Sequence, residues 1–201
     1  MHRTLVAGFG NILRGDDGFG VEMIRRLHEA PPRPHVVLLD VGTGGMLLVQ
    51  ELMSQYDRLL IIDAIDRRAS PGSVFLLSID GVRDAERVDT HFAVPAAALS
   101  VARALNVLPA EVKMLGCQPD PQSMEDLSTE LSPAVKGAIG KALEMINSLL
   151  DESSSQSVER AYAHDGNAAG EGRHLADLPQ HQPHESLSAP APIERRETPE
   201  A

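Results

Sequence analysis

Short apolar runs alternate, along the first 150 residues, with stretches in which apolar residues recur at helical spacing. Runs that are apolar nearly throughout predict strands buried on both faces of a sheet. These runs are 4–8, 36–39, 58–62, 74–77 and 112–115. The intervening stretches predict helices at 18–29, 46–55, 95–105 and 133–150. Strands that alternate with helices indicate an α/β fold with a mostly parallel sheet and helices on both faces.

The connection between the first strand and the first helix, residues 8–20, is rich in glycine and carries the adjacent acids Asp16 and Asp17. Such a turn marks the carboxyl edge of a parallel sheet, where open α/β folds place their sites. A dinucleotide-binding fingerprint would require glycine where Leu13 stands, and a P-loop would require Gly-Lys-Ser/Thr, whereas Gly15 is followed by two acids. Two carboxylates repel phosphate, so the loop favours a cation over a nucleotide.

The second and third predicted strands also end in acids, Asp40 and Asp63. Because the carboxyl ends of parallel strands lie at one edge of a sheet, acids that are far apart in the sequence are expected to converge there. A helix cap or a loop acid is the alternative interpretation of any single such residue. The presence of acids at three strand ends favours a site.

One histidine, His91, is placed to complete a metal-binding set, because it follows the fourth predicted strand in a polar loop just before a helix. Carboxylates with one imidazole form a mixed oxygen and nitrogen set that suits Zn, Ni, Fe or Mn and leaves coordination positions open. A solvated loop histidine is the alternative interpretation.

The sequence offers little support for other hydrolytic chemistries. Cys117 ends the fifth predicted strand, and a nucleophilic role would require a histidine and an acid close to it in space. A small buried residue at a strand end is the preferred interpretation. No nucleophile elbow surrounds a serine. No His-Glu-x-x-His helix is present, which excludes a thermolysin-like protease.

Composition changes near residue 150, which predicts one domain over 1–150 followed by a tail over 151–201. The tail has scattered large aliphatic residues without periodicity and is rich in Ser, Pro, Ala, Glu and His. Such a segment buries too little apolar surface to offset the entropy of ordering, so we expect it to be largely disordered. Its four histidines would bind metal only weakly, and a solvated polar tail is the preferred interpretation.

The overall balance of charge and apolar residues narrows the class of protein further. The 201-residue chain has a formal net charge of −11, which argues against a nucleic-acid partner. No run approaches the roughly 18 apolar residues that span a membrane, and the first residues lack a signal-peptide core. A single cysteine fits a reducing cytosol. We therefore expect a soluble, cytoplasmic protein without a membrane partner.

Taken together, five motifs in the chain resemble those of the hydrogenase maturation proteases, which trim the C-terminus of a [NiFe]-hydrogenase large subunit after nickel insertion. The motifs are Gly8-Phe-Gly-Asn-Ile-Leu-Arg-Gly-Asp-Asp-Gly-Phe-Gly20, Asp40-Val-Gly-Thr-Gly-Gly45, Ile62-Asp63-Ala64, Thr90-His91 and Gly116-Cys-Gln-Pro-Asp120. They occur in the family's order and at about its spacing, and the resemblance covers roughly residues 4–150. The resemblance implies a three-layer α/β sandwich around a twisted five-stranded sheet, with no nucleotide.

Carried over by position, the resemblance implies that Asp17, Asp63 and His91 contact the metal and carry the reaction. It implies that the enzyme holds no tightly bound metal, and that these side chains bind nickel that is already coordinated by the cysteines of the large-subunit precursor. Asp16 and Asp40 both stay open as the general base. The alternative function is a nickel-dependent chaperone or docking factor that binds the precursor without cutting it. A third possible function is that of a nucleotide-binding regulator, and the adjacent acids Asp16 and Asp17 argue against it.

Overall fold

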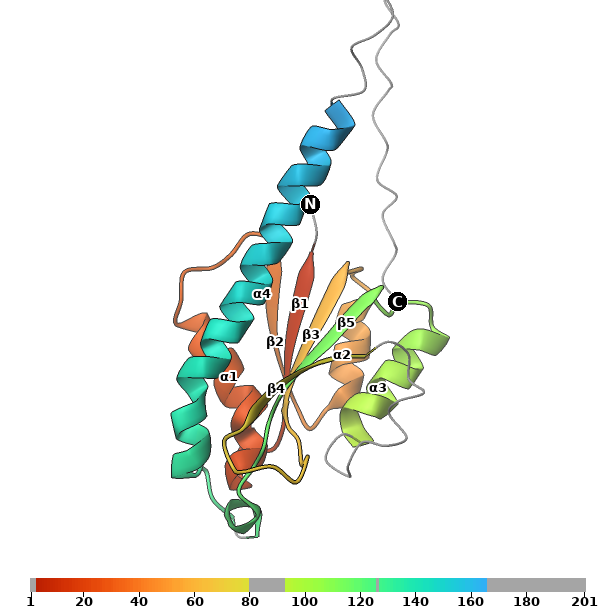
Figure 1. Cartoon of the computed structure of the whole chain (residues 1–201). Coiled ribbons are helices and arrows are strands. Elements are labelled where there is room, and N and C mark those ends of the chain that lie inside the picture. Colours follow the sequence, from red (N-terminus) through yellow and green to blue (C-terminus); the bar gives the residue numbers. More distant parts are fainter. Residues whose placement is uncertain (1–2, 80–92, 126, 166–201) are drawn as a thin grey trace, which may run out of the picture. The chain divides into compact units, whose positions relative to one another are not determined.

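The computed structural model describes residues 3–79, 93–125 and 127–165, which form a central sheet with helices on both faces (Figure 1). The strands are β1 (Thr4–Phe9), β2 (Val36–Gly42), β3 (Arg58–Ala64), β4 (Val74–Ser78) and β5 (Glu111–Cys117). Their order in the sheet is β2-β1-β3-β5-β4. Only β4 is antiparallel, to β5, so the prediction of a mostly parallel five-stranded sheet is confirmed.

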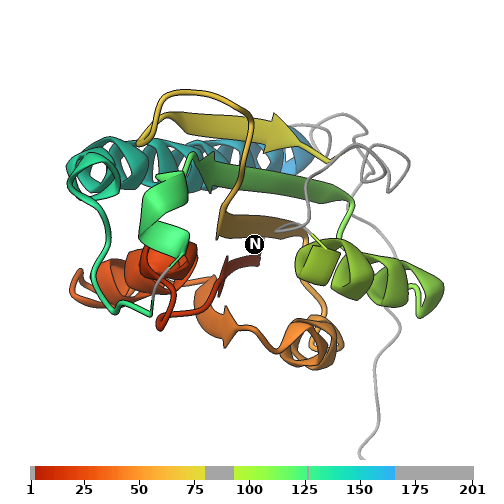
Figure 2. The ribbon, with the colours of Figure 1, turned by 90° about the horizontal axis from the view of Figure 1, so that it is seen from below.

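Two pairs of helices complete the sandwich, with α1 and α4 on one face and α2 and α3 on the other (Figure 2). The helices are α1 (Phe19–His28), α2 (Gly45–Leu52), α3 (Ala93–Ala104) and α4 (Pro133–Asp165). Two short 3-10 helices, η1 (Gly15–Gly18) and η4 (Pro121–Met124), precede α1 and α4. Among the described helices, none combines the length and the apolar character that a membrane crossing requires.

The core is split between the two faces by the alternation of side chains along the strands. Leu59 and Ile61 of β3 pack with α2 and α3, whereas Leu60 and Ile62 pack with α1 and α4. Each fully buried side chain of this kind is worth about 1.5–3 kcal/mol relative to an exposed one. This two-sided burial explains why the central strands are apolar nearly throughout.

One edge of the sheet is formed by β4, which pairs only with β5 among the described residues. Its Leu76 is 40% exposed.

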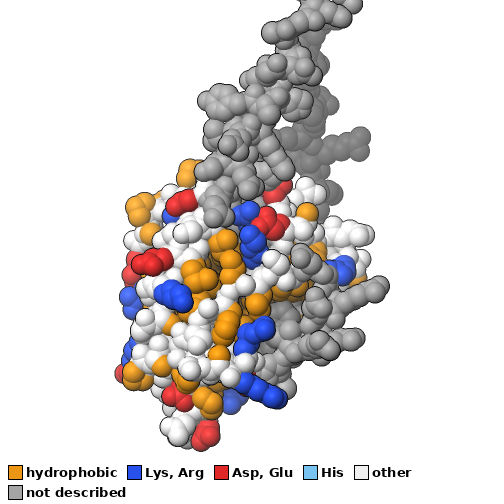
Figure 3. Space-filling view, in the orientation of Figure 1, with side chains coloured by type: hydrophobic (Ala, Val, Ile, Leu, Met, Phe, Trp, Pro, Cys, Tyr) orange, Lys and Arg blue, Asp and Glu red, His pale blue; other side chains and the backbone are white. Residues whose placement is uncertain are grey.

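On the face shown in Figure 3, hydrophobic side chains gather in the centre, and Lys, Arg, Asp and Glu side chains lie around them. Interspersed charges of both signs around apolar surface are usual for the exterior of a folded domain.

The ends of α4, β2 and β3 differ from those expected from the sequence. The prediction that the last helix ends near residue 150 was wrong, because α4 continues to Asp165. The predicted disorder of the tail stays a prediction, since residues 166–201 lie outside the described part of the chain. The strands β2 and β3 also run further than expected, to Gly42 and Ala64, so Asp40 and Asp63 lie inside strands rather than after them.

Candidate active site

The glycine-rich connection after β1 folds back tightly on itself, and Gly10 and Gly20 allow the close approach of α1 to the strands. Gly10 has a φ of 127°, and a Cβ there would lie 1.8 Å from the carbonyl oxygen of Asp17. A Cβ on Gly20 would lie 2.3 Å from the carbonyl oxygens of both Phe9 and Ile62. Because glycine has no Cβ, α1 begins directly against β1 and β3. The short helix η1 is thereby held at the carboxyl edge of the sheet.

Two of the three predicted site residues, Asp17 and Asp63, lie at this edge, close enough for their charges to interact. Asp17 is half-buried in η1, and its Oδ2 accepts a hydrogen bond from the backbone N–H of Asn11 at 3.2 Å. Asp63 is 2% exposed in β3, and its Oδ1 accepts one from the N–H of Ala64 at 2.8 Å. Burial raises the pKa of the Asp63 carboxyl well above its usual value, and the charge of Asp17 raises this pKa further.

Asp16, adjacent in sequence to Asp17, has the opposite environment. Its side chain is completely buried, with both oxygens accepting backbone hydrogen bonds. Oδ1 accepts from the N–H of Ser132 at 2.6 Å, and Oδ2 accepts from the N–H of Asp120 at 2.8 Å. A carboxylate so enclosed has no access to a substrate or to an attacking water. Of the two acids that the sequence left open as a general base, Asp16 is therefore excluded.

Asp40 lies at the same edge, on the far side of β1 from Asp63. It is paired in register with Gly8 of β1, and its side chain is exposed. The backbone N–H of Gly10 donates to the carbonyl of Gly42 at 3.1 Å, which ties the end of β2 to the glycine-rich connection. Asp40 is thus accessible to a substrate that approaches the carboxyl edge.

The third predicted ligand, His91, lies outside the described residues. Two residues after it, Ala93 begins α3. The start of α3 packs closely on the start of α2, because a Cβ added to Gly45 would lie 3.3 Å from the Cγ1 of Val94. Within residues 3–79, 93–125 and 127–165, no group of three or more His, Cys, Asp or Glu side chains is arranged to hold a metal ion. The assignment of Asp17, Asp63 and His91 as ligands stays a prediction.

Cys117 has the properties of a structural residue. Its side chain is buried at the end of β5, next to the α1 and α4 face of the sheet. Burial, and then the charge of Asp16, raise the pKa of the thiol to about 12. Reaction as a nucleophile requires the thiolate, which is scarce at neutral pH with such a pKa. The interpretation as a small buried residue at a strand end fits this environment.

Gln118 orders the loop after β3, a role that sequence reasoning missed. Its Oε1 accepts hydrogen bonds from the backbone N–H groups of Arg67 at 2.8 Å and Ala69 at 3.1 Å. Its Nε2 donates to Oδ1 of Asp66 at 3.0 Å. The sequence signal was its place in the motif Gly116–Asp120 at the end of β5. Its hydrogen-bond partners lie about fifty residues away in the chain, so no local pattern reveals them.

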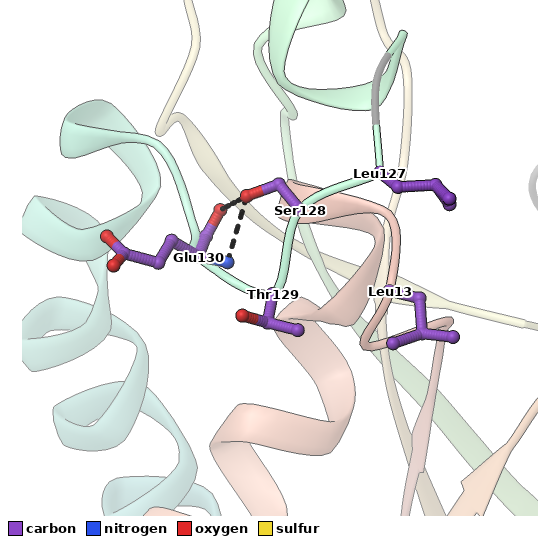
Figure 4. Close-up of a pocket in the computed structure, with 5 residues that line it drawn as sticks. All are labelled: Leu13, Leu127, Ser128, Thr129 and Glu130. Carbon is purple, nitrogen blue, oxygen red and sulfur yellow. Dashed lines mark hydrogen bonds between the residues drawn. The ribbon is translucent and has the colours of Figure 1, made fainter.

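A pocket of about 560 Å³ opens beside the glycine-rich connection and was also not foreseen. Its lining residues are Leu13, Leu127, Ser128, Thr129 and Glu130 (Figure 4). The two segments meet because the N–H of Gly15 donates to the carbonyl of Ser128 at 2.7 Å and the N–H of Ser128 donates to that of Leu13 at 3.0 Å. Leu13 is 53% exposed and Leu127 is 86% exposed, so the pocket has an apolar rim.

The fold and the acid pair define an α/β protein with a carboxylate site at the carboxyl edge of its sheet, and comparisons with known proteins identify the family. Residues 21–149 match the family model described as hydrogenase maturation protease. The chain is 33% identical over 167 residues to the hydrogenase 2 maturation protease of Escherichia coli, covering 81% of this chain and 99% of that one. It is 36% identical over 146 residues to the hydrogenase expression/formation protein HupD of Rhizobium leguminosarum, covering 71% of each chain.

Solved structures agree with these sequence matches. The hydrogenase maturating endopeptidase HybD from Escherichia coli aligns with a TM-score of 0.64 and 32% identity, over 75% of this chain and 93% of that one. The [NiFe] hydrogenase maturation protease HybD from Thermococcus kodakarensis aligns with a TM-score of 0.61 and 29% identity, over 73% and 98% of the two chains. The chain belongs to the hydrogenase maturation protease family, and it is an endopeptidase.

Proposed function

We propose that this endopeptidase removes a C-terminal extension from the precursor of a [NiFe]-hydrogenase large subunit after nickel insertion, and that it recognises nickel carried by that precursor. The observation that carries the proposal is the pair of Asp17 and Asp63, which lie together at the carboxyl edge of the sheet and interact electrostatically. Membership of the maturation protease family supports hydrogenase processing as the setting.

The charge of the acid pair explains why a cation would be bound here. A carboxyl whose pKa is raised by burial and by a neighbouring carboxylate is costly to ionise. A divalent cation at the pair supplies the opposite charge and favours loss of that proton, so metal binding and deprotonation are linked. With the imidazole of His91, the two carboxylates would form three ligands of the kind that nickel accepts and leave positions for the cysteines of the precursor.

In this proposal nickel belongs to the substrate and acts as a signal that metal insertion is complete. Asp17, Asp63 and His91 bind the nickel and so hold the peptide at the carboxyl edge. The scissile carbonyl is then polarised, or a water is positioned, by the nickel or by a carboxylate. Since Asp16 is enclosed by backbone donors, the exposed Asp40 is the remaining one of the two acids considered as a general base.

The ligand assignment is tested by replacing each residue separately and assaying cleavage of a nickel-loaded precursor. Asp17→Ala, Asp63→Ala and His91→Ala are each expected to abolish processing while retaining the circular dichroism spectrum of the wild type. Glu22→Gln serves as the control, because Glu22 pairs with Arg25 and Arg26 on the exposed side of α1. Full processing by two of the three alanine variants would refute the assignment.

A further inference from the structure

The enclosed carboxylate of Asp16 joins three parts of the chain that are far apart in the sequence. It lies in η1, and it accepts backbone hydrogen bonds from Asp120, after β5, and from Ser132, the residue before α4. Hydrogen bonds to an ionised acceptor are among the stronger ones. They compensate for the burial of a charge, which is otherwise highly unfavourable. An apolar side chain of the same size would leave both N–H groups without these acceptors, and that of Ser132 would be buried.

Further contacts around Asp16 hold residues 14–16 against the short helix η4. The guanidinium of Arg14 donates to the carbonyl of Met124 at 3.1 Å, and the N–H of Asp16 donates to the hydroxyl of Ser123 at 3.4 Å. Gly15 has a φ of 53°, and a Cβ there would lie 2.2 Å from the carbonyl oxygen of Ser123. The helix η1 is therefore fixed on one side by the segments 120–124 and 128–132, and on the other by Gly10 and α1.

We propose that Asp16 is the positioning residue of the site, a proposal that rests on the proposed function. The carboxylate of Asp16 anchors the backbone of η1 and thereby sets the side chain of Asp17, the next residue, beside Asp63. The two adjacent acids have divided roles, since Asp16 binds the protein's own backbone whereas Asp17 faces the substrate's metal. Because anchoring requires two acceptor oxygens, an amide at position 16 is an incomplete replacement: its oxygen accepts one bond, and its NH2 faces the second N–H.

The position of Asp17 can be read without any assay of activity. The N–H of Asn11 donates to Oδ2 of Asp17, so the exchange rate of the Asn11 amide reports whether that carboxylate is in place. For Asp16→Asn we expect this exchange to be at least about tenfold faster than in the wild type, which corresponds to the loss of one hydrogen bond. With a nickel-loaded precursor, kcat/KM is expected to fall at least about tenfold, since a displaced Asp17 no longer holds the precursor's nickel in the bound complex or in the transition state.

The control for lost stability is Ile146→Ala, which removes fully buried packing from α4 and leaves the contacts of Asp16 intact. It should unfold more easily but retain the exchange rate of the Asn11 amide and the kcat/KM of the wild type. If Asp16→Asn matches Ile146→Ala in both readouts, Asp16 is only a stabilising residue and the proposal is overturned. If the wild type itself fails to cleave the precursor, the proposed function fails, and the exchange of Asn11 alone decides the role of Asp16.

Discussion

The carboxyl group of Asp63 lies buried in β3 beside Asp17, and its pKa is raised first by this burial and then by the charge of its neighbour. Two acids in such an arrangement oppose folding, because the ionised form is better solvated in the unfolded chain than in the folded protein. Natural proteins retain unfavourable arrangements of this kind at functional sites. The relationship therefore links the stability of the metal-free enzyme to its proposed recognition of a cation.

The first prediction concerns the pH dependence of stability. Since the pKa of Asp63 is higher in the folded than in the unfolded state, its contribution is fully present below the unfolded-state pKa and is lost as pH rises towards the folded-state pKa. The loss is about 1.4 kcal/mol for each pH unit in that window. Asp63→Asn cannot ionise, so it should be more stable than the wild type at pH 7.

Urea unfolding with a chelator present, at several values between pH 4 and pH 8 (roughly the window above the usual aspartate pKa), measures this difference. The advantage of Asp63→Asn should grow as pH rises and shrink towards acid pH. A variant that is less stable than the wild type at neutral pH, or whose advantage is the same at every pH, would contradict the electrostatic account of the pair.

The second prediction concerns the close approach of α1 to the strands. Gly20→Ala should destabilise the protein by about 1–3 kcal/mol or more, because a Cβ there would overlap the backbone of Phe9 and Ile62, which cannot easily move. The matched control is Gly140→Ala in α4, where nothing lies within 4 Å of the new Cβ. That change should stabilise the helix by about 0.5–1 kcal/mol. Thermal unfolding of both variants checks the opposite signs.

The third prediction separates Cys117 from the chemistry. With a thiol pKa of about 12, roughly one molecule in ten thousand carries the thiolate at pH 8. Alkylation by iodoacetamide should therefore be very slow in the native protein and fast in urea. Cys117→Ala should process the precursor at close to the wild-type rate. Rapid labelling of the native protein, together with inactivation by the label, would restore a nucleophilic role.

The fold could be predicted because its signals are local. The apolar runs located all five strands, and the acids near their carboxyl ends predicted a site that includes Asp17 and Asp63, whose charges interact in the structure. The end of α4 could not be located in the same way. The sequence of residues 151–165 shows no apolar periodicity, but a helix propagates through its own backbone hydrogen bonds, and residues such as Glu159, Arg160 and Ala161 are good helix formers.

The division of roles between adjacent acids could not be predicted. Asp16 and Asp17 are identical side chains at neighbouring positions, and what separates them is the pair of backbone donors at Asp120 and Ser132. Those donors are more than one hundred residues away in the chain. The wall of the pocket from Leu127 to Glu130 depends on the same long-range pairing with the glycine-rich connection. Contacts of this kind leave no periodic or local trace in a sequence.

The most direct test is the intact mass of a large-subunit precursor after incubation with the purified enzyme, with and without nickel loading. The account predicts loss of a short C-terminal peptide in the nickel-loaded sample alone. Cleavage of both samples would leave an endopeptidase but remove the proposed role of Asp17, Asp63 and His91 as nickel ligands. An unchanged mass in both samples, with the precursor bound, would contradict the account and favour a chaperone that does not cut.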